Sequence, residues 1–164
     1  LLCIPGWCRS HTLKVGGQRA DLAMTKGYAR LQRRWEGGET IELEMDMPVE
    51  RVAAHPYVAD DRGKVALQRG PLVYCLEECD HKADVHSIAL PDDVKLTPRW
   101  RPRLLGGYTV LEGRGVDRRP RDGKAGRYEP ADAAPGRPAK ITAVPYCLWN
   151  NRRAGPMTVW LPRA

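Results

Sequence analysis

The sequence contains no phenylalanine, although it has five tryptophans and six tyrosines. No apolar run approaches the roughly 20 residues that a membrane-spanning helix needs, and no signal peptide is recognisable, so we expect no membrane partner. The chain also shows no three-turn amphipathic helix, no internal repeat, no Gly-rich phosphate loop and no nucleophile elbow. The sequence therefore carries none of the usual signatures of a helical bundle, a nucleotide-binding enzyme or a serine hydrolase.

The chain carries an excess of positive charge, and its basic residues are scattered along the sequence. Lys and Arg number 27 against 20 Asp and Glu, which gives a net charge of +7 and raises the question of a nucleic-acid partner. The densest basic stretch, 114–127, is rich in glycine and lacks the interleaved aromatic residues of a single-strand-binding surface. We therefore expect no nucleic-acid partner. A basic interaction domain stays an alternative, which strong salt-dependent binding to polyanions would favour.

The five cysteines are an odd number for a secreted disulfide scaffold. Cys3, Cys75 and Cys147 lie in apolar runs, where a free cysteine behaves as a small buried hydrophobic residue. We therefore predict a fold that does not depend on disulfides, and we favour a reducing, cytoplasmic location.

Short alternating segments separated by turn residues predict an all-β fold, a jelly-roll-like β-sandwich. The clearest is 40–47, where Ile41, Leu43, Met45 and Met47 would face a core. The continuous apolar run 72–77 predicts a strand buried on both faces. Further strands are expected at 2–4, 12–15, 27–33, 64–69, 87–90, 94–96, 104–112, 140–146 and 157–161.

Composition divides these strands into parts of two small sandwiches. We expect residues 1–55 to end a first sandwich, residues 56–140 to form a second, and residues 141–164 to form a C-terminal strand pair. The segment 113–139, rich in Gly, Pro, Arg and Ala, is expected to be a long disordered loop.

Few residues suggest chemistry. Cys75, Cys79, His81 and His86 are zinc-ligand types, but their spacing is poor for a tetrahedral site, so we predict no metal there. Glu77, at the end of the buried run, is expected to form a salt bridge with an arginine rather than to catalyse. We therefore predict no catalytic residue and no cofactor-binding residue.

Exposed tryptophans can stack on sugar rings, although a tryptophan in a β fold is more often part of a core. Trp100 lies between Arg99 and Arg101 and is the best exposed candidate. We take Trp100, Trp149 and Arg152 as candidate sugar-binding or inter-domain contacts.

Several motifs occur in an order that resembles a known family. They are Ile4-Pro5-Gly6-Trp7, the segment Arg33–Glu39, the specific run Gly63–Glu77, Val144–Arg152, and Met157–Leu161. The chain resembles the C-terminal region of glycoside hydrolase family 127, the β-L-arabinofuranosidase-like enzymes. The resemblance implies a parent with an N-terminal catalytic (α/α)6 barrel. There, a zinc-bound cysteine nucleophile and a glutamate acid/base carry out retaining hydrolysis.

The family's zinc site includes a pair of adjacent cysteines, and this sequence has no such pair. None of the family's catalytic or metal-binding residues can therefore be assigned here, and zinc is implied only for the barrel. The chain opens on Leu1-Leu2-Cys3-Ile4-Pro5, inside an apolar segment, so we expect it to be part of a larger protein.

The sequence thus predicts a non-catalytic C-terminal β-sandwich portion of a glycoside hydrolase. Its partners would be the missing catalytic barrel or a second copy in a homodimer, and carbohydrate would be reached through the parent. The alternative is a free-standing carbohydrate-binding module, which exposure of Trp100 and Trp149 on one face would support.

Overall fold

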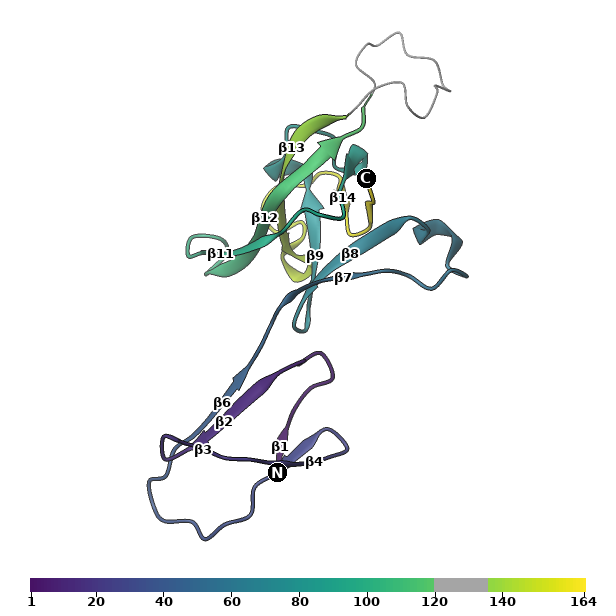
Figure 1. Ribbon diagram of the computed structural model, residues 1–164. Helices are drawn as coiled ribbons and strands as arrows, with labels where there is room; N and C mark the ends of the chain where they lie inside the picture. Colours follow the sequence, from purple (N-terminus) through teal and green to yellow (C-terminus); the bar gives the residue numbers. More distant parts are fainter. Residues whose placement is uncertain (120–135) are drawn as a thin grey trace. The chain divides into compact units, whose positions relative to one another are not determined.

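A computed structural model of the protein describes residues 1–119 and 136–164 and divides the chain into two compact units, Leu1–Pro48 and Val49–Ala164 (Figure 1). Within these residues every regular element is a β-strand or a single 3-10 turn, so the prediction of an all-β fold is confirmed. None of the helical turns described is long and apolar enough to span a bilayer.

The first unit consists of two three-stranded antiparallel sheets. One has the order β1 (Leu2–Cys3), β5 (Tyr28–Arg30), β4 (Ala23–Thr25), and the other β3 (Gln18–Arg19), β2 (His11–Val15), β6 (Ile41–Met45). Ile4, Leu13, Val15 and Ala29 are buried. Leu43 and Met45 are half-buried as the alternation predicted. Ile41, which pairs with the buried Val15, is exposed, so the prediction that it faces a core is wrong.

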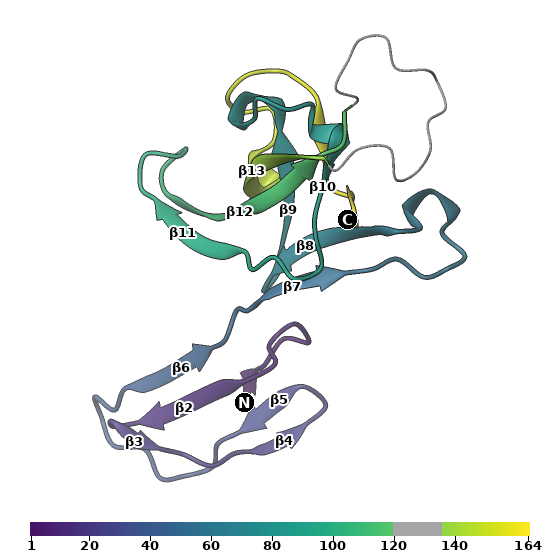
Figure 2. The ribbon, with the colours of Figure 1, turned by 45° about the horizontal axis from the view of Figure 1, so that its top comes forward.

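The second unit is built around one large antiparallel sheet (Figure 2). Its strands are β7 (Val49–Val52), β8 (Lys64–Arg69), β9 (Leu72–Glu77), β10 (Ile88–Ala89), β11 (Thr97–Arg101), β12 (Tyr108–Asp117), β13 (Arg137–Pro145), β14 (Met157–Thr158) and β15 (Leu161–Pro162). The main path runs β10-β12-β13-β9-β8-β15, while β11 pairs with β12, β14 with β9 and β7 with β8. The 3-10 turns are η1 (Ala59–Asp61), η2 (Glu78–Asp80), η3 (Val85–Ser87) and η4 (Tyr146–Leu148).

The two ends of this path meet. A parallel bridge joins Leu90, directly after β10, to Arg163, directly after β15. The Leu90 amide donates to the Pro162 carbonyl at 2.8 Å, and the Ala164 amide donates to the Leu90 carbonyl at 3.2 Å. The sheet is thereby closed on itself, which leaves fewer unpaired strand edges.

A tight hairpin joins β8 to β9. Arg69 pairs with Leu72, so Gly70 and Pro71 alone form the loop. Gly70 has a φ of 57°, and the favoured two-residue hairpin turns need a positive φ at this first loop position. Beyond the hairpin, β14 pairs with β9 and β15 pairs with β8, so the last strands continue both ladders.

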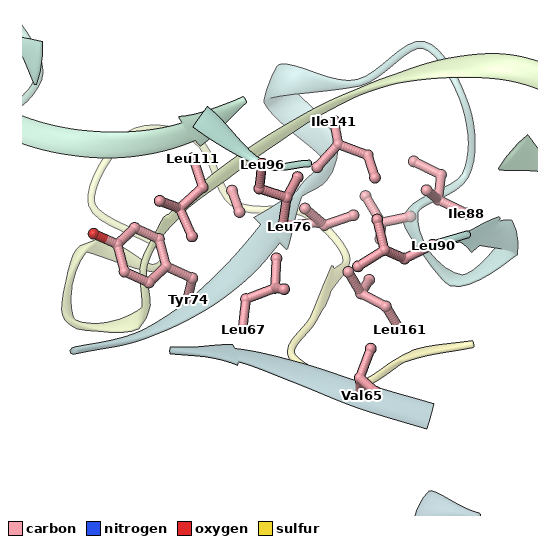
Figure 3. Packing of buried hydrophobic residues seen from close by; sticks show 12 residues of the cluster. Val65, Leu67, Tyr74, Leu76, Ile88, Leu90, Leu96, Leu111, Ile141 and Leu161 are labelled. Atoms are coloured by element: carbon pink, nitrogen blue, oxygen red, sulfur yellow. The ribbon is translucent and has the colours of Figure 1, made fainter. Parts of the chain in front are cut away.

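The main core lies inside the closed sheet (Figure 3). Side chains from β8, β9, β12, β13 and β15 meet there, together with residues of the segment between β9 and β11. The members are Val65, Leu67, Tyr74, Leu76, Val85, Ile88, Leu90, Leu96, Leu111, Ile141, Ala143 and Leu161. On the other face of the same strands, Cys75, Val110 and Val144 form a smaller cluster. Strand β9 is therefore buried on both faces over residues 74–77, as its apolar run predicted, while Val73 near its start is 40% exposed.

The prediction of a disordered loop over 113–139 is wrong at both ends of that segment. Strand β12 continues to Asp117 and β13 begins at Arg137, with seven register pairs between the two strands. Two glycines made this stretch resemble a loop. A Cβ on Gly113 would lie 2.5 Å from a Leu96 methyl, and one on Gly115 would lie 2.7 Å from an Ile141 methyl. These glycines are strand residues because close neighbours leave no room for a side chain. Residues 120–135 lie outside the described part of the chain.

The structure also divides the chain differently from the sequence prediction. The boundary falls after Pro48 rather than after residue 55, because 49–52 form β7, which pairs with β8. Residues 141–164 join the second unit rather than standing apart, since their strands pair with β8, β9 and β12. Strand β11 lies in a segment that was not predicted to be a strand, and residues 104–107 form a turn instead of the start of a strand.

Candidate functional site

The most developed polar feature is a charge cluster at the end of β9, which we call the Arg152 network (Glu77, Asp80 and Arg152). Arg152 donates to both Asp80 oxygens, at 2.8 and 2.6 Å, and to Oε2 of Glu77. Oε1 of Glu77 accepts the Asn150 amide at 3.1 Å. Glu77 is only 3% exposed, so this carboxylate is buried with its charge compensated. The predicted salt bridge between Glu77 and an arginine is confirmed.

Arg152 itself is held too firmly to act as a mobile ligand contact. The hydrogen bonds that Arg152 donates, above all to Asp80 and then to Glu77, raise the pKa of its guanidinium despite its burial. The group therefore stays charged and is engaged with two carboxylates. In this chain its guanidinium is held by the two carboxylates, and the residue positions the loop that carries it.

What the network positions is the loop 146–152. Leu148 is buried, and the Trp149 and Asn151 amides donate to the Tyr146 and Leu148 carbonyls at 3.0 and 3.3 Å. Asn150 has a φ of 61°, a left-handed conformation that asparagine tolerates. The buried Leu148, the Asn150 amide bound to Glu77 and the Arg152 side chain thus fix the loop at three points.

This fixed loop presents an aromatic pair to solvent. The rings of Tyr146 and Trp149 are stacked, with centroids 6.0 Å apart and planes inclined by 23°. Tyr146 is 46% exposed and Trp149 is 41% exposed. Trp149, one of the residues predicted to make contacts, is therefore accessible.

Trp100, the other predicted aromatic contact, is the more exposed of the two at 62%. Its indole lies over Gly107, where an added Cβ would come within 2.6 Å of the ring. Gly107 has a φ of 105°, so both its conformation and its missing side chain let the indole pack against the turn. Trp100 thus has a local packing partner and still leaves much of its surface in solvent.

A cavity of about 640 Å³ lies beside the Arg152 network, on the face of the sheet opposite the main core. Arg101, Arg103 and Lys140 contribute charge, and Leu104, Val110 and Val144 contribute apolar surface. Arg101 forms an ion pair with Glu112, and Lys140 lies 4.0 Å from the same carboxylate. Arg152 and Asp80 also line this cavity, but neither exposed tryptophan does, so the three predicted contact residues do not converge on one site.

The zinc-ligand types of the sequence do not assemble a metal site. His81 Nδ1 lies 2.7 Å from the Glu77 carbonyl and must donate to it, while its Nε2 accepts the Thr142 amide at 3.2 Å. Both ring nitrogens are therefore engaged in joining β9 to β13. Burial, aided by the Glu77 charge, raises the pKa of the Cys75 thiol to about 12, so it is neither a ready ligand nor a nucleophile.

One cluster among the described residues does bring metal-ligand atoms together, within 4.8 Å: Glu77, Cys79 and Asp80. Both of its carboxylates already bind Arg152, and burial raises the pKa of the Cys79 thiol. The cation in this cluster is the guanidinium. These residues do not fit the zinc that the family resemblance implies for the parent.

A second ionic cluster, at Asp117, was not predicted from the sequence. This carboxylate, 6% exposed, accepts hydrogen bonds from the Arg119 side chain and amide and, at 2.9 Å, from the Ser87 hydroxyl. The Arg119 side chain above all holds the pKa of Asp117 at about 2. Asp117 was hidden because it falls in the stretch predicted as a loop, and Ser87 is far from it in sequence. The cluster ties η3 to the end of β12.

Comparisons with known proteins follow the same division into two units. Residues 49–162 match the family model described as the glycoside hydrolase family 127 C-terminal domain. Residues 1–47 match the model described as the β-L-arabinofuranosidase, GH127 middle domain. The two matches meet where the structure separates its units.

Individual relatives are similar along nearly the whole chain. A non-reducing end β-L-arabinofuranosidase of Bifidobacterium longum subsp. longum is 38% identical over 99% of this chain, which spans 25% of that protein. The crystal structure of a GH127 β-L-arabinofuranosidase from Geobacillus stearothermophilus T6 is 41% identical. Its TM-score is 0.83, with 99% of this chain and 26% of that chain covered. A structure titled glycoside hydrolase is 36% identical, with a TM-score of 0.85 over 99% of this chain and 27% of its own. The chain thus spans about a quarter of the length of these relatives.

Proposed function

The chain belongs to glycoside hydrolase family 127, and from this we propose that it is the non-catalytic C-terminal β portion of a longer glycoside hydrolase, where it supports the catalytic part. The observation that carries the proposal is the match of residues 49–162 to the family's C-terminal domain, in a chain that spans about a quarter of its relatives. We propose that the parent has the catalytic barrel implied by the resemblance, and that any zinc is bound there.

The chemistry of the described residues favours a structural role for this chain over a catalytic one. Most retaining glycosidases use two free carboxyl groups about 5 Å apart, whereas the family resemblance implies a cysteine nucleophile with a glutamate acid/base. The buried Glu77 and its neighbour Asp80 are both bound to Arg152, and Glu112 is paired with Arg101. The Cys75 thiol is buried, with a pKa of about 12. These groups hold strands and loops together.

For the parent we propose hydrolysis of β-L-arabinofuranosides, because relatives that cover nearly this whole chain carry that name. The test begins with an immunoblot of extract from the source cells, using antibody raised to this chain. A band several times heavier than 18.4 kDa supports the proposal. The purified long protein should then cleave an aryl β-L-arabinofuranoside, while chain 1–164 alone should not. A native band at 18.4 kDa would refute the proposal.

A second candidate function is carbohydrate binding, favoured by the exposure of Trp100 and Trp149. The two residues lie in different elements, β11 and the loop after η4. Titration of chain 1–164 with arabino-oligosaccharides, followed by tryptophan fluorescence, tests this candidate. Saturable quenching that disappears in Trp149→Ala or Trp100→Ala would support it, and unchanged fluorescence would count against it. Homodimerisation is a further role that sedimentation of the long protein would reveal.

A further inference from the structure

We propose that the aromatic pair Tyr146 and Trp149 is a docking surface for the part of the parent polypeptide outside residues 1–164. The inference rests on the proposed function and names the surface through which this chain would support the rest of the enzyme. Tyrosine and tryptophan are the residues most enriched at the energetic centres of protein interfaces, because they offer large area at low conformational cost. Here two of them stand together, each more than two-fifths exposed.

The loop 146–152 is fixed by more than the burial of Leu148. Glu77 also accepts the Asn150 amide, and Arg152 binds Glu77 at the end of the loop. Burying these charges costs free energy that apolar side chains would not. What the arrangement provides is a fixed direction for the two rings. A rigid surface loses less entropy when a partner binds.

The shape of the surface favours a protein partner over a sugar. Small ligands bind in concave sites with convergent polar groups. Tyr146 and Trp149 stack on each other, so each ring already covers part of the other, and neither lines the 640 Å³ cavity. The charged groups that fix this loop, Glu77 and Arg152, are bound to one another rather than directed at a ligand. An exposed apolar pair beside satisfied polar groups is typical of the centre of a protein interface.

The extent of the relatives indicates which protein that partner is. The relatives named above are about four times as long as this chain, with 25–27% of their length covered. Most of their polypeptide therefore lies outside the matched region and must pack somewhere on it or near it. A covalently linked partner is present at a high effective concentration, so even a two-residue anchor is occupied.

Hydroxyl-radical footprinting read by mass spectrometry tests the proposal on the long protein and on chain 1–164. We expect Tyr146 and Trp149 to be oxidised about tenfold more slowly in the long protein than in chain 1–164, as for residues in a desolvated hot spot. Tyr57, which is 90% exposed, is the internal control and should react equally in both. Equal reactivity of Trp149 in the two proteins, or equal protection of Tyr57, would overturn the inference and leave the proposed function standing. A native protein of 18.4 kDa would refute both.

A pair of variants separates docking from internal packing. Trp149→Ala should lower the melting temperature of the long protein and leave that of chain 1–164 unchanged, while Trp149→Phe should restore most of the loss. Equal destabilisation of both proteins by Trp149→Ala would assign Trp149 to the fold of this chain and overturn the inference. Protection of Trp149 in chain 1–164 that disappears on dilution would identify a second copy as the partner and would also overturn it.

Discussion

Replacing Arg152 by methionine should destabilise the second unit strongly, whereas the same change at the adjacent Arg153 should not. Met keeps much of the arginine stem but removes the charge that compensates Glu77 and Asp80. Breaking a buried ion pair from one side costs about 3–5 kcal/mol, because the remaining charge is left uncompensated. Arg152 keeps 22% exposure and Asp80 keeps 19%, so solvent relieves part of this cost. We therefore expect a loss near the lower end, about 3 kcal/mol.

Arg153 provides the matched control. Its side chain is 70% exposed and lies 3.7 Å from Glu78, which is itself 47% exposed. An exposed pair of this kind is worth about 0.5 kcal/mol or less. The two variants remove the same charge at neighbouring positions, so any difference between them reports burial of the network and not net charge.

The assay is thermal unfolding of chain 1–164 followed by near-ultraviolet circular dichroism. For a unit of this size about 3 kcal/mol corresponds to a drop of about 12 °C, and about 0.5 kcal/mol to about 2 °C. The double variant Glu77→Gln with Arg152→Met should recover part of the loss, because only the less buried Asp80 then stays uncompensated. Equal shifts for Arg152→Met and Arg153→Met, or a double variant less stable than Arg152→Met alone, would refute the reasoning.

Three further predictions concern other residues of the second unit, with one control, Gly37, in the first unit. The Asp117 pKa is lowered to about 2. The ionised carboxylate therefore stabilises the fold above the unfolded pKa near 4, and this stabilisation is lost as pH falls towards 2. In urea titrations, Asp117→Asn should lower the free energy of unfolding by up to about 2 kcal/mol at pH 7 and by almost nothing at pH 2. Buried Cys75 should resist iodoacetamide in the native protein while exposed Cys147 reacts, and mass spectrometry showing equal labelling would contradict this. Gly115→Ala should lower the free energy of unfolding by about 1–3 kcal/mol, since its Cβ would lie 2.8 Å from a backbone carbonyl. Gly37→Ala, with open space around it, should be nearly neutral in the same melting assay.

Local patterns in the sequence were sufficient for much of the fold. The hairpin at Gly70-Pro71 needs only a turn between two apolar runs, and it forms with the two-residue loop that those residues favour. The alternation over 40–47 placed Leu43 and Met45 on the inner face of β6. The continuous run 72–77 indicated burial on both faces, and the carboxylate at its end indicated an ion pair, which Arg152 supplies.

Other features could not be predicted because their cause is distant in sequence. Gly113 and Gly115 resemble loop residues until Leu96 and Ile141 are seen to fill the space where their side chains would be. The prediction of a separate strand pair at 141–164 differs from the structure because strand pairing joins segments far apart in the chain, and composition does not record which ones.

The sequence by itself determined the β class, the positions of most strands and the family, since these depend on short-range periodicity and on runs such as 63–77. The tertiary structure alone decided that the sheet closes through Leu90 and Arg163 and that His81 joins β9 to β13. It also decided that Arg152 is engaged with Glu77 and Asp80, while the aromatic pair beside it is left in solvent. Each of these features depends on contacts between segments that only folding brings together. The cost of burying charge and the need to pair buried backbone groups determine which contacts form.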